Sequence, residues 1–408
     1  MDTPLVMHLG TAERQLRVAV VTETYPPEVN GVAMTTGRVV DGLLRLGHQV
    51  QLVRPRQGQD DRPTSAQGLE EVLSRGMPIP RYNQLKLGLP ARSALQRLWS
   101  LRRPDVVQVV TEGPLGWSAV AAARKLCLPV ITEFHTNFHR YSGYYGVGWL
   151  KQPVAAWLRR FHNKGEVCLV PTPELAAELR ARGVRRVEVV ARGVDTGLFH
   201  PARRSTALRR AWGAGDDTVV VAVVGRMAPE KNLALAVRAF DALCAVQPDA
   251  RLLFVGDGPA RAALEAARPE FIYAGMRSGE DLAAHYASAD LFLFPSTTET
   301  FGNVTTEALA SGLPVVSFNY AAAAQRVRSD DNGWLVPLGD EAGFIQAAQR
   351  LGADAALRRR LAARARAGVA DADWDGIVGR LLAVMNEVIA AHEARQAQGG
   401  RLGGPRTV

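Results

Sequence analysis

The chain has 408 residues, of which 47% are hydrophobic and 22% charged, a composition typical of globular proteins and unlike that of disordered or fibrous chains. Basic residues outnumber acidic ones by 49 to 40, and this excess favours anionic partners such as nucleotide phosphates, nucleic acid or a membrane surface. No apolar run reaches the roughly 18 residues of a membrane-spanning helix.

The N-terminal residues lack the basic and then apolar pattern of a secretory signal. The three cysteines, Cys127, Cys168 and Cys244, are an odd number without a closely spaced pair. They argue against a disulfide scaffold and a thiolate zinc site, and they suit a reducing compartment. We therefore expect a cytoplasmic protein.

Apolar runs alternate with helix-length segments along the first half of the chain. The expected strands are residues 17–22, 49–54, 105–110, 129–133, 166–170 and 187–190. Helix-like stretches, among them residues 31–46, 116–126 and 173–182, lie between them. Continuous apolar runs are typical of strands buried on both faces, so this pattern predicts a parallel sheet built from βαβ units.

Two stretches of the first half combine tryptophan and leucine with basic residues. Residues 85–103 and 149–163 carry them at spacings that resemble interfacial helices. Ordinary helices packed on the sheet would have the same pattern. On the first interpretation, the protein attaches peripherally to the anionic inner face of the cytoplasmic membrane.

The alternation restarts after a linker at residues 193–204. Expected strands are residues 218–224, 251–256, 271–274, 291–294 and 314–317, with a helix at residues 232–245. We predict two doubly wound α/β domains, residues 15–195 and 196–372. A long helix at residues 373–395 follows, and residues 396–408 form a tail that we expect to be disordered.

Five clusters of polar residues follow predicted strands, where parallel sheets keep their ligands. Asn30-Gly31 begins a helix, whose free N–H groups suit a phosphate, although an ordinary strand-to-helix turn would have the same residues. His135 lies in Phe-His-Thr-Asn-Phe-His, four residues before His139. It suits a substrate hydroxyl better than a metal, because no further ligand cluster is evident, and a structural histidine would have the same pattern. In Phe254-Val-Gly-Asp-Gly-Pro, Asp257 suits a helix cap.

The other two clusters lie in the second half. Arg226 and Lys231 flank a turn before a helix and would suit a diphosphate, or they are solvated loop charges. Glu299 and Glu307 have seven residues between them, which places one in a turn and one on the next helix. A capped helix with surface acids would have the same spacing. Lys231 and Glu299 fall at predicted loop ends rather than in the core, so alanine at either position should remove most activity with little change in melting temperature.

The Gly-Arg-x-x-x-Glu-Lys-Asn stretch and the E-x7-E stretch together resemble retaining glycosyltransferase family 4, across residues 17–393. The resemblance implies the GT-B fold: two Rossmann-like domains facing a central cleft, with the C-terminal helix crossing back to the first domain. Within the family, the Phe-His-Thr-Asn-Phe-His stretch resembles bacterial α-mannosyltransferases that use GDP-mannose, and related glycolipid glycosyltransferases.

The resemblance assigns roles to individual residues. It implies that the Gly31 backbone approaches the donor phosphate, that Arg226 and Lys231 hold the diphosphate, and that His135 lies near the reacting sugar. It further implies contacts of Glu299 with sugar hydroxyls, of Glu307 with the ribose, and of the Phe301 and Gly302 backbones with sugar and phosphate. The sequence departs from the family where Asn319-Tyr-Ala-Ala-Ala-Ala replaces a common Gly-Gly pair.

The activity implied is transfer of a hexosyl group, mannose favoured, from a nucleotide sugar to a lipid or lipid-linked acceptor. The donor is GDP-mannose or a UDP-hexose, and the resemblance implies neither cofactor nor metal. Asp371-Ala-Asp373 matches the D-x-D of metal-dependent transferases but precedes a helix, so we expect a cap. Transfer to a soluble acceptor and a non-catalytic sugar-nucleotide-binding protein are the alternatives. No nucleic-acid module is evident.

Overall fold

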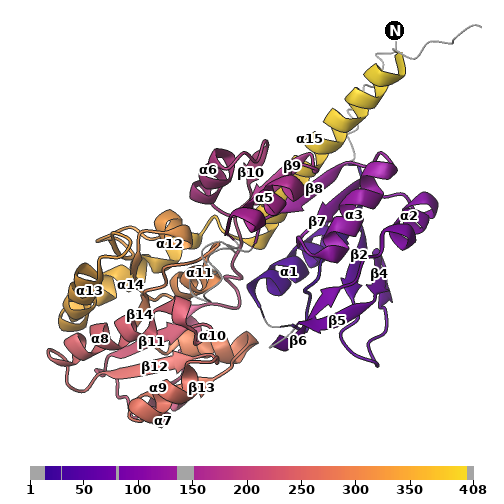
Figure 1. The fold of residues 1–408 in the computed structure, drawn as a ribbon. Helices are drawn as coiled ribbons and strands as arrows, with labels where there is room; N and C mark the ends of the chain where they lie inside the picture. The colour runs from indigo at the N-terminus through magenta and orange to yellow at the C-terminus, as the bar shows by residue number, and fades with distance from the viewer. Residues whose placement is uncertain (1–13, 29, 80–81, 136–150, 402–408) are drawn as a thin grey trace, which may run out of the picture. The chain divides into compact units, whose positions relative to one another are not determined.

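The computed structural model describes residues 14–28, 30–79, 82–135 and 151–401 (Figure 1). Contacts divide these residues into two compact units. The first comprises residues 14–134, 161–168 and 382–401, and the second comprises residues 135, 151–160 and 169–381. The predicted boundary at residue 195 stays a prediction.

The first sheet is mainly parallel, as the apolar runs predicted. Its strands are β1 (Arg17–Val21), β2 (Gln49–Pro55), β3 (Ser65–Ala66), β4 (Leu69–Ser74), β7 (Val106–Val109), β8 (Val130–Glu133), β9 (Val167–Val170) and β10 (Val187–Val189). They lie in the order β10-β9-β8-β7-β1-β2-β4-β3, and β3 pairs antiparallel with β4. The connecting helices are α1 (Gly31–Arg45), α2 (Arg92–Leu101), α3 (Pro114–Lys125), α5 (Lys151–His162) and α6 (Pro173–Ala181).

The second sheet is parallel throughout and has six strands. They are β11 (Val220–Val224), β12 (Arg251–Val255), β13 (Ile272–Gly275), β14 (Leu291–Phe294), β15 (Val315–Phe318) and β16 (Gly333–Val336). The order β13-β12-β11-β14-β15-β16 is that of a Rossmann fold. Its direction reverses between β11 and β14, and ligands of such sheets bind at the carboxyl ends of the strands at this point.

Helices surround the second sheet and explain why its strands are apolar on both faces. They are α7 (Thr206–Ala211), α8 (Leu233–Cys244), α9 (Arg261–Ala267), α10 (Gly279–Ala287), α11 (Asn303–Ala310), α12 (Ala321–Arg326), α13 (Glu341–Ala353) and α14 (Ala355–Ala365). Along β11, Val221 and Val223 pack with Phe240 and Phe344 in one core. Their neighbours Val220, Ala222 and Val224 belong to a second core. Successive side chains of a strand thus fill two hydrophobic layers.

The structure corrects the interpretation of residues 85–103 as one interfacial helix. Strands β5 (Gly76–Ile79) and β6 (Tyr82–Gly88) form an antiparallel hairpin, and only α2 is helical. The leucines at 85, 87 and 89 alternate with period two, which is the spacing of a strand. In α2, Leu95 and Trp99 are buried in the core of the first unit, so the alternative of a packed helix is correct here.

The C-terminal helix α15 runs from Trp374 to Arg401 (Figure 1). Its residues up to Leu381 belong to the second unit and those from Leu382 to the first, which confirms the predicted C-terminal helix that returns to the first domain. The expectation of disorder from residue 396 is wrong for residues 396–401, which continue the helix. Gln396 donates to the Cys127 carbonyl at 3.2 Å, one turn after His392 contacts the same oxygen.

None of the helices in the described part of the chain has both the length and the apolar character that crossing a bilayer requires. Residues 402–408 and most of the Phe-His-Thr-Asn-Phe-His stretch, including His139, lie outside the described residues.

Candidate active site

The switch point of the second sheet brings together residues that the sequence analysis singled out. Arg226 follows β11, and Glu299 lies in the turn after the neighbouring strand β14. The ends of β11 and β12 approach closely because glycine occupies both. A Cβ atom on Gly256 would lie 2.0 Å from the Gly225 carbonyl oxygen, and both glycines have positive φ.

Lys231 and Glu299 form an ion pair at this point. Lys231 ends the short 3-10 helix η3 (Pro229–Lys231), and its Nζ contacts Oε1 of Glu299. Ser296 Oγ donates to the same carboxylate oxygen at 2.7 Å. The two charged side chains are only 19% and 11% exposed, so neither is a solvated surface charge. We therefore revise the expectation for the alanine variants, because removal of one partner leaves a shielded charge unpaired.

Arg226 is anchored by a residue that the sequence analysis did not single out. Its guanidinium lies 3.5 Å from Glu230, four residues further on, and Glu230 is almost completely buried. The arginine itself is 44% exposed. A cation fixed at one end of a strand and open to solvent is suited to an anionic ligand. The spacing of four residues in the motif was the signal that could have identified Glu230.

Glu307 lies on α11, half-buried, and accepts a hydrogen bond from Tyr286 Oη at 2.9 Å. Burial raises the pKa of the Glu307 carboxyl from 4.5 to about 7, and the hydrogen bond from Tyr286 only partly offsets this. A surface acid, which was the alternative interpretation, would not have a fully buried tyrosine as its partner. No pattern in the sequence identified Tyr286, which lies 21 residues earlier.

The turn between Glu299 and α11 is held by the residues that replace the family's glycine pair. Gly302 has φ +93° and caps α11. Phe301 is buried, and its carbonyl accepts a hydrogen bond from Ala322 N at 2.8 Å. This carbonyl therefore already has a partner within the protein. Tyr320 Oη donates to the Glu299 carbonyl at 2.7 Å. Ala321 adopts φ +54°, so the left-handed backbone that favours glycine is kept without one.

His135 is held by two residues of the second unit. Arg192 Nη2 lies 2.9 Å from His135 Nδ1, and Thr300 Oγ1 donates to the His135 carbonyl at 2.7 Å. Arg192 and Thr300 were not among the predicted site residues. Thr300 directly follows Glu299, so the histidine and the E-x7-E turn belong to one cluster.

Gly31 lies in the first unit, exposed at the start of α1. Its approach to a donor phosphate stays a prediction. The preceding residue, Asn30, caps the helix by accepting from Val32 N and Ala33 N at 3.1 and 2.9 Å. The Asn30 amide also donates to Thr24 Oγ1 at 2.7 Å. The Asn30 side chain therefore connects the first turn of α1 with the loop before the helix.

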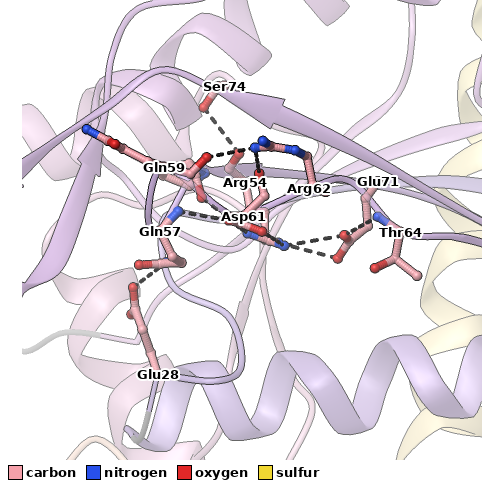
Figure 2. Close-up of polar contacts among 10 residues, drawn as sticks. Glu28, Arg54, Gln57, Gln59, Asp61, Arg62, Thr64, Glu71 and Ser74 are labelled. Carbon is pink, nitrogen blue, oxygen red and sulfur yellow. Dashed lines mark hydrogen bonds and ion pairs between the residues drawn. The ribbon is translucent and has the colours of Figure 1, made fainter.

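Figure 2 shows a network of polar contacts that supports the loop before α1. The buried Arg54 guanidinium pairs with Asp61 at 2.6 Å and with Glu71 at 3.3 Å. Gln57 donates its backbone N–H to Asp61 at 2.8 Å and its side-chain amide to Glu28 at 2.5 Å. The network connects β2 and β4 with the loop that precedes α1.

Glu23 directly follows Thr22 at the carboxyl end of β1, and only 8% of it is exposed. Its Oε1 accepts from Leu115 N at 3.0 Å, at the start of α3. Gly113 permits this approach, because a Cβ there would lie 2.0 Å from the carboxylate. Burial raises the pKa of Glu23 from 4.5 to about 7.

The two remaining aspartate predictions have different outcomes. Asp373 Oδ1 accepts from Gly376 N at 2.6 Å in the first turn of α15, which confirms the D-x-D as a helix cap. Asp257 does not cap α9, which begins after Ala260. It accepts from Gly258 N at 2.7 Å and pairs with Arg261 at 3.3 Å.

Comparison with known families assigns both halves of the chain. Residues 29–198 match the family described as Glycosyltransferase Family 4, and residues 218–354 match Glycosyl transferases group 1. A GDP-mannose-dependent alpha-mannosyltransferase of Mycobacterium tuberculosis is 34% identical over 372 residues, covering 90% of this chain and 95% of that protein. The Sulfoquinovosyl transferase SQD2 of Arabidopsis thaliana is 29% identical, covering 92% of this chain and 74% of that protein.

Solved structures share the fold. Sucrose-phosphate synthase from Thermosynechococcus elongatus superposes with a TM-score of 0.73 at 20% identity, covering 93% of this chain and all of that one. HepE from Anabaena, in complex with UDP and glucose, gives 0.71 at 17% identity, covering 91% of this chain and all of that one. The fold is GT-B, with two Rossmann-like domains.

Proposed function

Because the chain belongs to glycosyltransferase family 4, we propose that it transfers mannose from GDP-mannose to a lipid or lipid-linked acceptor. We further propose that transfer retains the anomeric configuration and requires no metal ion. The observation that carries the proposal is the cluster at the switch point of the second sheet. There Arg226 follows β11, Lys231 pairs with Glu299 after β14, and Glu307 lies on the next helix, α11; in Rossmann folds, ligands bind at this end of the sheet.

The charges of this cluster suit a departing nucleoside diphosphate. Negative charge grows on the leaving phosphate as the sugar bond breaks. Arg226 and Lys231 are held by carboxylates before any ligand binds, so they need little reorganisation. A single preorganised donor of this kind contributes about 3 kcal/mol to catalysis, or roughly 100-fold in rate.

The acids have complementary roles. The Glu299 carboxylate is held in place by Lys231 and Ser296, and there it can accept hydrogen bonds from hydroxyls of the donor sugar. Glu307, eight residues further along, would accept hydrogen bonds from the ribose hydroxyls. The acceptor would attack the face from which the diphosphate leaves, and a phosphate oxygen would take its proton. No protein nucleophile is required for this route.

Mannose and GDP are favoured because three relatives named GDP-mannose-dependent alpha-mannosyltransferase are 32–34% identical over at least 90% of this chain. The second candidate is a UDP-hexose donor with diacylglycerol as acceptor. It is supported by relatives named Alpha-monoglucosyldiacylglycerol synthase, at 25–26% identity over 74% of this chain. Transfer to a soluble acceptor is the alternative to a lipid acceptor.

A lipid acceptor requires contact with a membrane, and we propose that this contact is peripheral. Leu101 at the end of α2 is 86% exposed, and Trp157 on α5 is 42% exposed. Basic residues accompany both. Flotation with anionic liposomes at low and high salt tests this contact. Binding at low salt that weakens at high salt is expected, and absence of binding in both would contradict it.

Donor turnover measured by mass spectrometry tests the function itself. GDP-mannose, UDP-glucose, UDP-galactose and UDP-glucuronic acid are incubated separately, with and without diacylglycerol and with EDTA. We expect turnover of GDP-mannose that a lipid acceptor increases and EDTA leaves unchanged. Turnover of a UDP-sugar would favour the second candidate, and inhibition by EDTA would contradict metal independence. No turnover of any of the four donors would contradict the proposed donor and acceptor.

A further inference from the structure

We propose that Arg192 is a positioning residue that fixes the tautomer and orientation of His135. Its guanidinium would keep the His135 ring in the form that carries its hydrogen on Nε2. The importance of this for transfer rests on the proposed function, which places His135 near the reacting sugar. The tautomer itself can be measured independently of any activity.

The inference begins with one contact. Arg192 Nη2 lies 2.9 Å from Nδ1 of His135. A guanidinium has only hydrogen-bond donors, so Nδ1 must be the acceptor. A neutral imidazole has one acceptor and one donor nitrogen, and its hydrogen is therefore on Nε2. The contact thus selects one of the two tautomers of the ring.

Arg192 is itself firmly held. It is only 6% exposed, and its guanidinium lies 5.9 Å from the centre of the buried Phe301 ring. Nη1 lies 3.5 Å from the side-chain oxygen of Asn303, the first residue of α11. A planar guanidinium can contact an aromatic ring, an amide oxygen and an imidazole at once. The compact ammonium of lysine cannot do so in the same way.

The backbone of His135 is held by the same turn. Thr300 donates to the His135 carbonyl at 2.7 Å, and Phe301, which contacts Arg192, is the next residue. Thr300 and Phe301 directly follow Glu299, which is proposed to bind the sugar. This arrangement would set the direction of the Nε2–H donor relative to a hydroxyl of the donor hexose. Such precise orientation strongly affects the rate of transfer.

Nitrogen NMR of protein labelled with ¹⁵N-histidine tests the tautomer directly. The His135 signals are assigned by their loss in His135→Gln. We expect an unprotonated Nδ1 and a protonated Nε2 in the wild type. In Arg192→Met the ring should exchange between tautomers, so that the two nitrogen shifts move towards each other. A hydrogen on Nδ1 in the wild type, or unchanged signals in Arg192→Met, would overturn the proposal.

A matched control is Arg366→Met. Arg366 also belongs to the second unit and donates to backbone carbonyls, including that of Ala310 at 2.8 Å. We expect its replacement to leave the His135 signals unchanged. If both arginine variants altered the signals alike, the effect would be general and Arg192 would not be a specific positioning residue.

A double-mutant cycle tests the consequence for transfer. Arg192→Met should lower kcat about tenfold, which corresponds to the loss of one charged hydrogen bond. In the His135→Gln background the same change should alter kcat less than about twofold, because Arg192 acts through the histidine. An equal loss in both backgrounds would contradict this role. Absence of transfer by the wild type would contradict the proposed function alone, and the NMR comparison would then decide on Arg192.

Discussion

The Lys231–Glu299 pair offers a way to separate stability from catalysis. We consider Lys231→Met, Glu299→Gln and the double variant. Each single change removes one partner from a pair whose side chains are 19% and 11% exposed. In Lys231→Met the Glu299 carboxylate keeps the hydrogen bond from Ser296 but loses its counter-charge. In Glu299→Gln the shielded ammonium loses its counter-charge instead.

Breaking a fully buried ion pair by removing one partner costs about 3–5 kcal/mol. This pair retains some contact with solvent, so we expect about 2 kcal/mol for each single variant. For a unit of this size, that loss lowers the melting temperature by roughly 4–8 °C. Replacing both partners leaves no unpaired charge, and the double variant should melt within about 2 °C of the wild type.

Thermal unfolding and donor turnover are measured on all four proteins. The double variant should regain stability but not activity, with turnover at least about 100-fold below the wild type. A double variant as unstable as the single ones would refute the reasoning about the pair. A stable double variant that retains turnover would refute the role of the pair in catalysis.

Three further predictions concern the acids Glu23 and Glu307 and the strained backbone of Ala321. Between pH 4.5 and about 7 the Glu23 carboxyl stays protonated in the folded state, whereas in the unfolded state it ionises. The stability of the wild type therefore falls as pH rises through this range. Glu23→Gln should remove up to about 3 kcal/mol of this fall. If thermal unfolding of the wild type and of Glu23→Gln depended on pH in the same way, the prediction would be wrong. The pKa of Glu307 is also about 7, so the KM for the donor should rise as pH falls below that value. A protonated carboxyl is a poorer acceptor of hydrogen bonds from the ribose hydroxyls. The hydrogen bond from Tyr286 lowers the pKa of Glu307, so Tyr286→Phe should raise this pKa and shift the rise in KM to higher pH; identical KM profiles would exclude this. Ala321→Gly should stabilise the protein by roughly 0.5–1 kcal/mol by relieving its positive φ of 54°, and a lower melting temperature would refute this.

The sequence predicted the sheets well where strands are apolar on both faces. The runs that became β1, β7, β11 and β14 consist largely of valine, leucine and phenylalanine, and their strand character is local information. The β5–β6 hairpin was missed because tryptophan and arginine nearby suggested an interfacial helix, although the leucines alternate as in a strand. The helix α15 extends past residue 396 because its last turns contact the Cys127 carbonyl.

Candidate site residues could be named from the sequence, but their partners could not. Arg226 and Glu299 belong to local motifs at strand ends, and their spacing is visible in the chain. Lys231 and Glu299 are 68 residues apart, and their pairing depends on β11 and β14 being neighbours in the sheet. His135 and Arg192 are 57 residues apart. Only the folded structure shows that these residues meet, and that Lys231 is shielded rather than solvated.

Titration calorimetry with GDP tests most directly whether the switch-point cluster is the donor site. Arg226→Met is compared with Arg277→Met, a control in the same unit with 39% exposure, whose guanidinium pairs with the acid four residues on at 3.0 Å. We predict that GDP binds the wild type and that Arg226→Met weakens binding about tenfold, while Arg277→Met leaves it unchanged. Equal affinity of GDP for the wild type and Arg226→Met would contradict the account.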